Sequence, residues 1–501
     1  MAKCAPALFL NKNGDIMANE VMMQAFEWDS PSDGNFYKNL SKNAKTLKEK
    51  GIDALWLPPA SKGGSDQDVG YGIYDLWDLG EFDQKGTVRT KYGTKEEYLQ
   101  AIKDLHDAGI KVYADVVLNH KANADFTETF KAIMVDQNDR TKDVGEAHDI
   151  EAWTGFDFKN RKGKYSDFVW HYYHFSGVDY DVKTETSAIY RVLGENKYWN
   201  TGVSNEKGNF DYLMFADIDH DHPEVREEIF KWVDWFMDET GVDGFRYDAL
   251  KHISDSFILD LTNHIMEKKK DDFYLIGEYW QYSKEEIDGY LDDTDWHIDL
   301  FDVPLHFHME EASKSNGEYD MRKIFDGTIV KDHPLQAVTF VDNHDSQPQQ
   351  ALESWVEDWF KEIAYGLILL RKDGYPCVFA GDYYGLNGPV KIDPKMEMID
   401  KILKARKTYA WGEEDDYFDH PQVVGWVRRT DEEHSSLAVL ISIGDMAEKQ
   451  MFVGKEEAGK TYVDLSGKNK NEIIIDEEGN GNFQVGPGAI TYWVDKESIG
   501  E

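Results

Sequence analysis

The chain has 501 residues, of which 41% are hydrophobic and 14% aromatic, and its formal net charge is −41. This composition excludes an intrinsically disordered chain, and a length far beyond about 150 residues predicts more than one domain. The negative charge excludes nucleic acid as a partner, because such binding depends on Lys and Arg that neutralise phosphates. No stretch approaches the roughly 20 apolar residues that cross a bilayer, which argues against a membrane protein.

The first 19 residues predict an extension ahead of the folded chain. They hold a short apolar stretch without a convincing signal-peptide cleavage site, so we expect a cytoplasmic protein, with secretion as the alternative. Met17 precedes the first strand-like run and is an alternative native start, in which case residues 1–16 would not be native. The two cysteines, Cys4 and Cys377, do not predict a disulfide framework.

Apolar runs bounded by turn residues predict eight strands in the first four-fifths of the chain. Helical patterns separate most of them, and Pro223 suits the first turn of one helix. Strands that alternate with helices predict parallel pairing, and eight such units predict a (β/α)8 TIM barrel. The strands are expected near residues 21–27, 52–58, 110–118, 242–247, 273–278, 298–305, 336–342 and 375–380, and helices at 36–50, 95–108, 223–240, 253–269 and 352–371.

Two parts of the chain leave this alternation. Residues 121–216 are polar and aromatic, and because a structureless loop of that length is improbable, we predict an inserted subdomain after the third strand. Short alternating runs after residue 412, separated by Gly, Asp and Asn, predict a C-terminal antiparallel β domain. The predicted domains are an extension at 1–19, a catalytic barrel at 20–120 and 217–412, an inserted subdomain at 121–216, and a β domain at 413–501.

Three acidic residues lie where barrel enzymes carry their chemistry. Asp248 follows the fourth predicted strand, Glu278 ends the fifth and Asp345 follows the seventh, so we expect them to converge on one mouth of the barrel. Arg246 shares a strand face with Asp248 and favours its ionised form, as a nucleophile requires. Apolar neighbours on the face of Glu278 favour the protonated form of a general acid. Any one of these acids alone would more simply be a surface residue.

Four segments, at residues 115–120, 244–252, 276–280 and 340–345, resemble the signature regions of the α-amylase family of glycoside hydrolases. The likeness covers roughly residues 20–495 and is greatest to the bacterial liquefying type. It implies endo-hydrolysis of α-1,4-glucosidic bonds in starch, glycogen or maltodextrins by a retaining double displacement. A maltooligosaccharide-forming exo-amylase or a transglycosylase is the alternative, and a non-catalytic glucan-binding protein is a remote one. We expect an α-glucan as the partner and a monomer as the working form.

The resemblance also assigns roles to single residues. Asp248 would be the nucleophile, Glu278 the general acid and base, and Asp345 the stabiliser of the distorted sugar. A lone aromatic residue or histidine is more often part of a core than of a site, and only its place in a matched motif favours a binding role. The residues expected to contact the substrate are Trp28, Tyr71, His120, Arg246, Lys251, His252 and His344.

The segment at residues 217–223 alternates Asp and His and has three interpretations. The pattern is compatible with a transition-metal site, or with a solvated turn in which Asp221 caps the following helix. The resemblance implies instead a structural calcium, whose hard oxygen ligands suit that ion. Its ligands would be Asn119, Asp211, Asp217 and the backbone carbonyl of His252.

Further metal sites are doubtful. Many liquefying enzymes use additional aspartates for a second calcium and a sodium, and Ser176 and Asn200 stand at two of those positions here. Asp219 and Asp221 are retained and would be the remaining ligands. Because the loss of two anionic ligands weakens such a site, we expect one firm calcium, with any additional calcium or sodium weak or absent.

Overall fold

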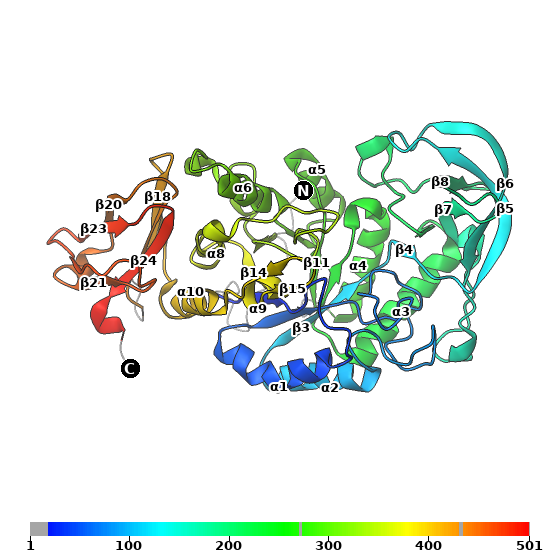
Figure 1. Cartoon of the computed structure of the whole chain (residues 1–501), viewed down its shortest axis with the longest axis horizontal. Helices are drawn as coiled ribbons and strands as arrows, with labels where there is room; N and C mark the ends of the chain where they lie inside the picture. The colour runs from blue at the N-terminus through cyan, green and yellow to red at the C-terminus, as the bar shows by residue number, and fades with distance from the viewer. Residues whose placement is uncertain (1–18, 270–272, 430–433, 500–501) are drawn as a thin grey trace. The chain divides into compact units, whose positions relative to one another are not determined.

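The computed structural model describes residues 19–269, 273–429 and 434–499 (Figure 1). Most of the predicted extension, including Cys4, lies outside the described residues. In the part of the chain that is described, no helix has both the length and the apolar character needed to cross a membrane. The chain divides into two compact units, one built from Ser30–Lys45 and Leu55–Leu300 and the other mainly from Phe301–Glu501 with the first strand.

Eight parallel strands form a closed barrel in the order β1, β14, β13, β12, β11, β10, β3 and β2. Most of them are buried along their whole length, as expected for parallel strands that helices cover. All eight expected strands are present, so the predicted TIM barrel is confirmed. Their bounds are β1 Met22–Gln24, β2 Ala54–Leu57, β3 Lys111–Val116, β10 Gly244–Tyr247, β11 Tyr274–Gly277, β12 Asp299–Phe301, β13 Ala337–Phe340 and β14 Tyr375–Phe379.

Local sequence signals account for where several barrel helices begin and end. Thr94 and Glu97 form a capping box at the start of α2, and Pro223 opens α3, which ends at Gly241 in a left-handed conformation with φ 66°. The bounds are α1 Phe36–Glu49, α2 Lys95–Asp107, α3 Pro223–Thr240, α4 Asp255–Lys269, α5 Lys284–Asp293, α6 Val303–Lys314, α7 Ile329–Asp332, α8 Lys361–Leu369, α9 Ala380–Tyr384 and α10 Met396–Tyr409.

Two expected elements were too long. The strand expected at 298–305 ends at Phe301, because the Asp302 side chain accepts a hydrogen bond from the Leu305 N–H and caps α6. The helix expected at 352–371 is confined to α8, because the segment before it is bonded to the loop after β13. There the Val356 N–H donates to Asp342 Oδ2 at 3.2 Å.

A six-stranded antiparallel sheet lies in the chain between β3 and α3, in the order β4, β9, β7, β8, β5, β6 (Figure 1). β4 and β9, the first and last of these strands along the chain, pair with each other, with His120 opposite Asp217. The insertion therefore returns to the point where it left the barrel. The sheet spans residues 120–218, slightly beyond the expected 121–216. Its strands are β4 His120–Lys121, β5 Phe126–Val135, β6 Asp143–Gly155, β7 Phe175–Asp181, β8 Thr186–Val192 and β9 Ala216–Ile218.

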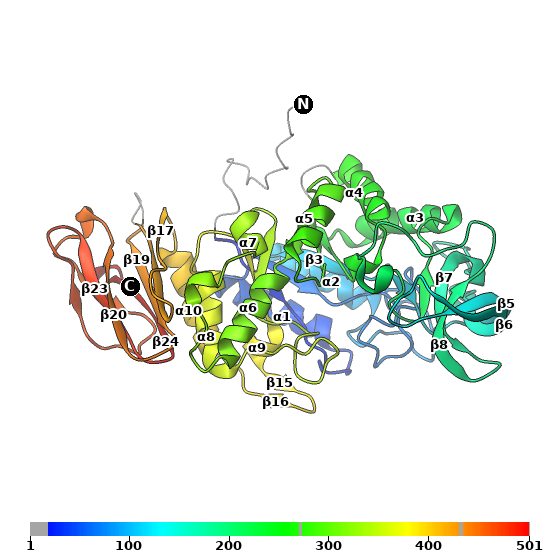
Figure 2. The ribbon, with the colours of Figure 1, turned by 90° about the horizontal axis from the view of Figure 1, so that it is seen from above.

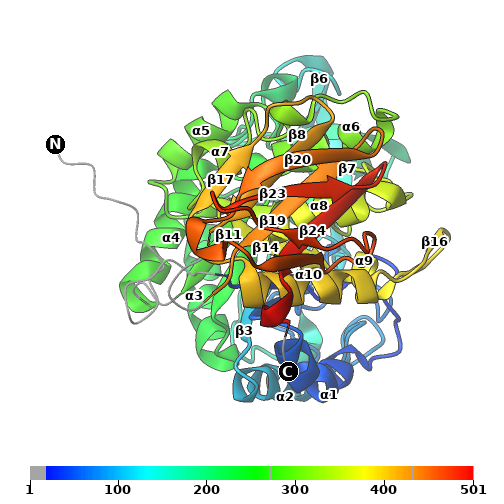
Figure 3. The same cartoon turned by 90° about the vertical axis from the view of Figure 1, so that its left-hand side faces the viewer.

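The C-terminal part of the chain forms the antiparallel β structure that was predicted (Figure 3). A six-stranded sheet runs in the order β17, β18, β19, β24, β21, β22, and β20 pairs with β23. Trp493, Tyr462 and Phe483 contribute to its core. The bounds are β17 Glu414–Tyr417, β18 Val423–Arg428, β19 Leu437–Ser442, β20 Ala447–Phe452, β21 Thr461–Asp464, β22 Ile473–Ile474, β23 Asn480–Val485 and β24 Ala489–Asp495.

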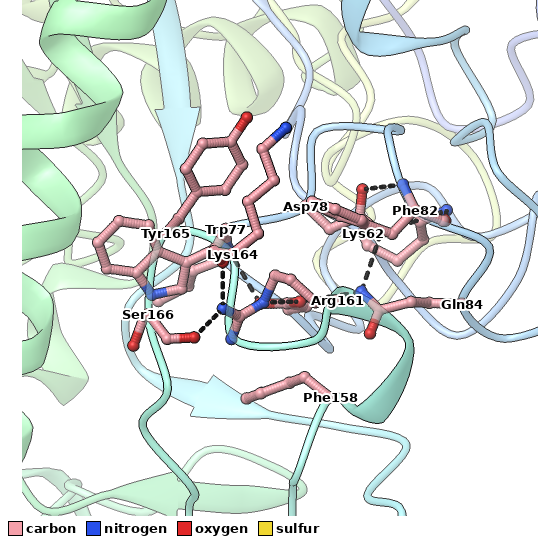
Figure 4. Close-up of polar contacts among 12 residues, drawn as sticks. Lys62, Trp77, Asp78, Phe82, Gln84, Phe158, Arg161, Lys164, Tyr165 and Ser166 are labelled. Carbon is pink, nitrogen blue, oxygen red and sulfur yellow. Dashed lines mark hydrogen bonds and ion pairs between the residues drawn. The ribbon is translucent and has the colours of Figure 1, made fainter.

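Buried charges connect the loop after β2 to the inserted segment (Figure 4). Arg161 Nε donates to Asp75 Oδ2 at 2.9 Å, and the Lys62 ammonium lies 3.6 Å from Asp78 Oδ2. Gln84 Nε2 donates to both carboxylates at 2.9 Å. Lys62, Asp75 and Asp78 are fully buried. Because buried charges need partners, this network fixes the loop that also carries Tyr71 against the insertion.

Replacing Arg161 by Met should destabilise the fold strongly, because Asp75 would keep a buried charge without its arginine. We expect a loss of about 3 to 5 kcal/mol in the free energy of unfolding, measured by equilibrium unfolding in urea. Lys231→Met is the control, since Lys231 pairs with Glu227 on the exposed surface of α3 and should contribute little. Equal destabilisation by the two substitutions would contradict the role of the network.

Candidate active site

Asp248 and Glu278 follow neighbouring strands at matching positions. In the register of β10 and β11, Tyr247 lies opposite Gly277, so each acid comes directly after its strand. The Glu278 N–H donates to the Tyr247 carbonyl at 2.9 Å and continues the pairing by one residue. Both side chains are more than nine-tenths buried. The parallel register therefore places two carboxyl groups side by side at the carboxyl ends of the strands, where barrel enzymes carry their active sites.

The Arg246 guanidinium lies at the centre of this group. Its Nη1 donates to Asp248 Oδ1 and its Nη2 to Glu278 Oε2, each at 2.6 Å. Nη1 also contacts both oxygens of Asp115, at 3.1 and 3.2 Å. Arg246 is completely buried, and the surrounding carboxylates outweigh its desolvation, so its pKa stays well above the ordinary value. One fixed positive charge thus orients three acids.

The expectation that Asp248 and Glu278 have opposed environments was wrong. Strand alternation showed that Arg246 and Asp248 share a face, but the long arginine side chain also reaches Glu278 on the next strand. The backbone N–H of Ala249 adds a second donor to Glu278 Oε2, at 3.3 Å. Ala249 adopts a left-handed conformation with φ 54°, which is strained for a residue with a side chain. Such strain next to Asp248 is typical of functional sites.

Asp115 is a member of this group that the sequence reasoning did not single out. It is the one acid in β3, a buried strand, and this is the signal that would have identified it. Trp56 Nε1 and the Tyr71 hydroxyl donate to its Oδ2, at 2.9 and 2.8 Å. Burial raises the pKa of Asp115 to about 6, and the attraction of Arg246 opposes this rise. Asp115 therefore connects Arg246 with Tyr71, one of the predicted substrate contacts.

The other substrate contacts predicted in the unit that contains β10 and β11 lie close to the inserted subdomain. His120 Nε2 is 2.8 Å from the Tyr71 carbonyl, and burial lowers the pKa of His120. Lys251 Nζ donates to Glu206 at 3.1 Å, and His252 Nδ1 is 2.7 Å from the Phe210 carbonyl. His252 is almost completely buried. Contacts of these residues with a substrate stay predictions.

The second unit brings together the other predicted residues. Asp345 follows β13, and His344 Nε2 lies 3.4 Å from Asp345 Oδ2. His344 Nδ1 is 2.9 Å from Gln24 Nε2. The Trp28 ring stacks nearly parallel to the His344 ring, with 6.1 Å between their centroids. The Trp28 N–H donates to Gln347 Oε1 at 3.1 Å. The ends of β1 and β13 thus place an acid, an imidazole and a half-exposed aromatic ring next to one another.

Buried oxygen atoms gather at the predicted calcium position. Asp211 and Asp217 are fully buried, and Asn119 Nδ2 donates to Asp217 Oδ1 at 3.3 Å. Asn200 Nδ2 donates to Asp211 Oδ1 at 2.9 Å. Burial raises the pKa of Asp211 to about 7, and burial followed by repulsion from Asp211 raises the pKa of Asp217 well above its ordinary range. The fold thus gathers carboxyl groups whose ionised forms a bound cation would stabilise.

The donor set fits calcium. Asn119 Oδ1 and Asn200 Oδ1 are buried and have no hydrogen-bond partner among the described residues, although buried polar atoms are rarely left unpaired. The hydrogen bond from the His252 ring to the Phe210 carbonyl holds His252 close to Phe210, the residue before Asp211 in the chain. Amide, carboxylate and carbonyl oxygens are the ligands that calcium prefers.

Asp219 pairs with the ammonium group of a lysine and is not left for a metal ion to neutralise. The Lys197 ammonium donates to Asp219 Oδ2, and both side chains are more than nine-tenths buried. Ser176, at one of the positions where an aspartate was missing, donates its hydroxyl to Asp217. Asp221 is exposed, and it does not cap α3, because His222 occupies the cap position and makes no capping bond through its side chain. The interpretation of Asp221 as the cap was wrong.

The transition-metal interpretation of residues 217–223 loses support. Donor atoms of His174, His222 and Glu224 do lie within 4.8 Å of one another. The His171 N–H donates to His174 Nδ1 at 2.9 Å, so the neutral ring carries its proton on Nε2 and donates it to Glu224 at 3.0 Å. Burial lowers the pKa of His174 to about 4. Both ring nitrogens of His174 are therefore engaged in hydrogen bonds, whereas His222 Nδ1 has no hydrogen-bond partner among the described residues.

Comparisons with known proteins agree with this geometry. The profile described as "Alpha amylase, catalytic domain" matches residues 29–439. The chain is 50% identical over 482 residues to a glucan 1,4-alpha-maltohexaosidase of Bacillus sp. (strain 707), covering 95% of this chain and 93% of the relative. It is also 50% identical to an alpha-amylase of Bacillus licheniformis, with coverages of 95% and 94%.

A more distant relative and a solved structure extend the picture. A cytoplasmic alpha-amylase of Escherichia coli (strain K12) is 39% identical over 496 residues, covering 96% of this chain and all of the relative. The crystal structure of an Anoxybacillus alpha-amylase, 17% identical, superposes with a TM-score of 0.63 over 95% of this chain and 96% of that chain. At this low identity the superposition supports the fold alone.

The position of Asp115 predicts a pH effect. Above pH about 6 the Asp115 carboxylate is ionised and holds Arg246, whereas below it the acid is protonated and this attraction is lost. Activity should therefore fall on the acid side with a step near pH 6. Asp115→Asn resembles the protonated form and should lower kcat/KM about tenfold or more at pH 7, without that step. The measurement is kcat/KM from pH 4.5 to 8, and wild-type activity of the variant at pH 7 would contradict the role.

Proposed function

The chain belongs to the α-amylase family of glycoside hydrolases, and we propose that it hydrolyses internal α-1,4-glucosidic bonds in starch, glycogen or maltodextrins with retention of configuration. The observation that carries the proposal is the single guanidinium of Arg246 shared by Asp248 and Glu278. Two carboxyl groups held by one planar group are close together, and retaining glycosidases separate theirs by only about 5 to 5.5 Å.

In the proposed mechanism Asp248 is the nucleophile. Its carboxylate attacks the anomeric carbon while Glu278 donates a proton to the glycosidic oxygen, so the bond to the leaving sugar breaks as the glycosyl ester forms. Glu278 then takes a proton from water, which attacks the same carbon and releases Asp248. Arg246 donates hydrogen bonds to both groups and holds them in place. The second displacement restores the original configuration.

Asp345 and the residues near it have further roles in the proposed mechanism. Asp345 follows the barrel strand β13 and would stabilise the distorted sugar, with His344 beside it. Tyr71 and Trp28 would provide aromatic surfaces for sugar rings, and His120 would form a hydrogen bond near the cleavage point. Such contacts contribute to catalysis when they strengthen as charge develops in the transition state.

We also propose one structural calcium per chain. Asn119, Asp211, Asp217 and the backbone carbonyl of His252 would hold it, and the Asn200 side chain, which bonds to Asp211, has a buried Oδ1 without a partner among the described residues. Calcium would neutralise the buried carboxylates and fix the insertion to the strand end that carries Asp248. The Lys197 ammonium at Asp219 supports the absence of a further tightly held ion.

The nearest alternative is an exo-acting member of the same family. One relative at 50% identity is named a maltohexaosidase, which supports release of short chains of fixed length. The cytoplasm stays the proposed location, which the name of the Escherichia coli relative supports, and secretion stays the alternative. A monomer is the proposed working form.

A time course on amylose with an anomer-resolved product assay tests the function. We expect early products of mixed, long chain length and of α configuration, because internal bonds are cleaved with retention. Asp248→Asn, Glu278→Gln and Asp345→Asn should each lower kcat on the order of 10³-fold, since each removes a group that acts on the reacting centre. Asp260→Asn is the control, because this acid pairs with Arg226 at the exposed surface of α4.

Two outcomes would change the proposal. A single short product from the start of the reaction would favour the exo-amylase. Undiminished hydrolysis by Asp248→Asn, or products of β configuration, would contradict the retaining mechanism.

Metal analysis after dialysis against calcium-free buffer should give close to one calcium per chain. Asp217→Asn should lower both the calcium occupancy and the midpoint of thermal unfolding, because it removes a buried anionic ligand. Asp260→Asn, at an exposed position of α4, is the control and should change neither. Three tightly held ions per wild-type chain would contradict the proposal.

A further inference from the structure

Lys361, the first residue of α8, lies fully buried between two aspartates. Its Nζ donates to Asp342 Oδ2 at 2.6 Å and lies 2.7 Å from Asp382 Oδ1. Both aspartates are also buried, and the ammonium sits 3.3 Å from the centre of the Trp355 ring. The two buried carboxylates share this ammonium, and each would lose a buried counter-charge without it.

Asp342 begins the loop that leads to Asp345. The Ser346 hydroxyl donates to Asp342 Oδ1 at 2.7 Å and accepts the Asn343 N–H at 2.9 Å. Asn343 Oδ1 in turn accepts the N–H of Asp345 at 2.9 Å and that of Ser346 at 2.8 Å. The backbone at Asp345 is therefore fixed through a continuous set of hydrogen bonds that starts at the carboxylate of Asp342.

The other side of Lys361 is anchored to the helices. Asp382 lies on α9, and its Oδ2 accepts a hydrogen bond from the Tyr365 hydroxyl of α8 at 2.8 Å. α8 and α9 each pack against α10 (Figure 2). Lys361 thus links a packed helical layer to the loop after β13, and it is too deeply buried to touch a substrate itself.

We propose that Lys361 is a positioning residue for catalysis, whose ammonium holds Asp342 and, through Ser346 and Asn343, sets the position of Asp345. The inference rests on the proposed role of Asp345. A carboxylate that stabilises a transition state must be placed accurately, and a shift of about 1 Å costs up to 10²-fold in rate.

Kinetics of Lys361→Met and Lys361→Arg on amylose test the proposal. Lys361→Met keeps the length of the side chain but removes its charge, and kcat should fall at least tenfold while KM changes less than about threefold, because Asp345 acts on the transition state. Lys361→Arg retains a cation that can contact both aspartates, and it should recover most of the lost kcat.

The pH profile separates positioning from a merely structural role. The charged and titratable groups that act on Asp342 are Lys361 and Tyr365 of α8 and Asp382 of α9, and His306 of α6 bonds to the carbonyl of the neighbouring Val341. Burial raises the pKa of Asp342 and Lys361 opposes this rise. Without Lys361 the pKa should rise further, so the ionised form that anchors Ser346 is lost at higher pH. The acid limb of kcat should therefore move to higher pH in Lys361→Met and return in Lys361→Arg.

Arg406→Met is the matched control. Arg406 is as deeply buried and lies in the same unit, where it donates to the carbonyls of Leu369 at 2.6 Å and Glu20 at 3.4 Å. These carbonyls precede β14 and β1, so Arg406 acts at the amino ends of the strands, the face of such barrels associated with stability. Its loss should lower the midpoint of thermal unfolding but leave kcat at 25 °C within about twofold.

The outcomes separate the two proposals. Wild-type kcat in Lys361→Met, or an equal loss of kcat in Arg406→Met, overturns the positioning role while an inactive Asp345→Asn leaves the proposed function intact. An unchanged acid limb in Lys361→Met also overturns the positioning role. An inactive wild type, or full activity of Asp345→Asn, overturns the proposed function and with it the role of Lys361.

Discussion

A guanidinium sealed inside a barrel is the constraint on which this site depends. Arg246 has no access to water, so its charge is stable only if carboxylates surround it, and three neighbouring positions supply them. Asp115 on β3, Asp248 after β10 and Glu278 after β11 meet this requirement. Their ion pairs with Arg246 stabilise the barrel at this point and also hold the groups that would perform the reaction. Stability and chemistry therefore share their residues here.

The barrel was predictable because its strands are buried on both faces and so read as continuous apolar runs. The ends of elements were less predictable. Asp302 turns an apolar run into a helix start through one capping bond, and Asp342 draws the segment at Val356 away from α8. Both effects come from an acidic side chain that accepts a hydrogen bond from the backbone N–H of a residue further along the chain. The apolar pattern of the sequence does not show such bonds.

The candidate site also has contacts that could be predicted from the sequence and contacts that could not. Residues two positions apart along an extended segment, such as Arg246 and Asp248, could be paired from alternation alone. The bond from Arg246 to Glu278 could not, because it depends on strand register and on the length of the arginine side chain. Asp115 and Lys361 carried only the signal of a charge in an apolar segment. Recognising their partners required the folded chain, and the roles of the acids stay predictions.

The ion pair of Lys197 and Asp219 has a consequence for the conditions under which the protein can work. A metal ion is in exchange with its surroundings, and its occupancy falls when the free concentration drops or a competing binder is present. An ammonium that is part of the chain is present at one copy per molecule whatever the medium contains. Asp219 therefore has a counter-charge within the chain, and this ion pair needs no ion from the medium.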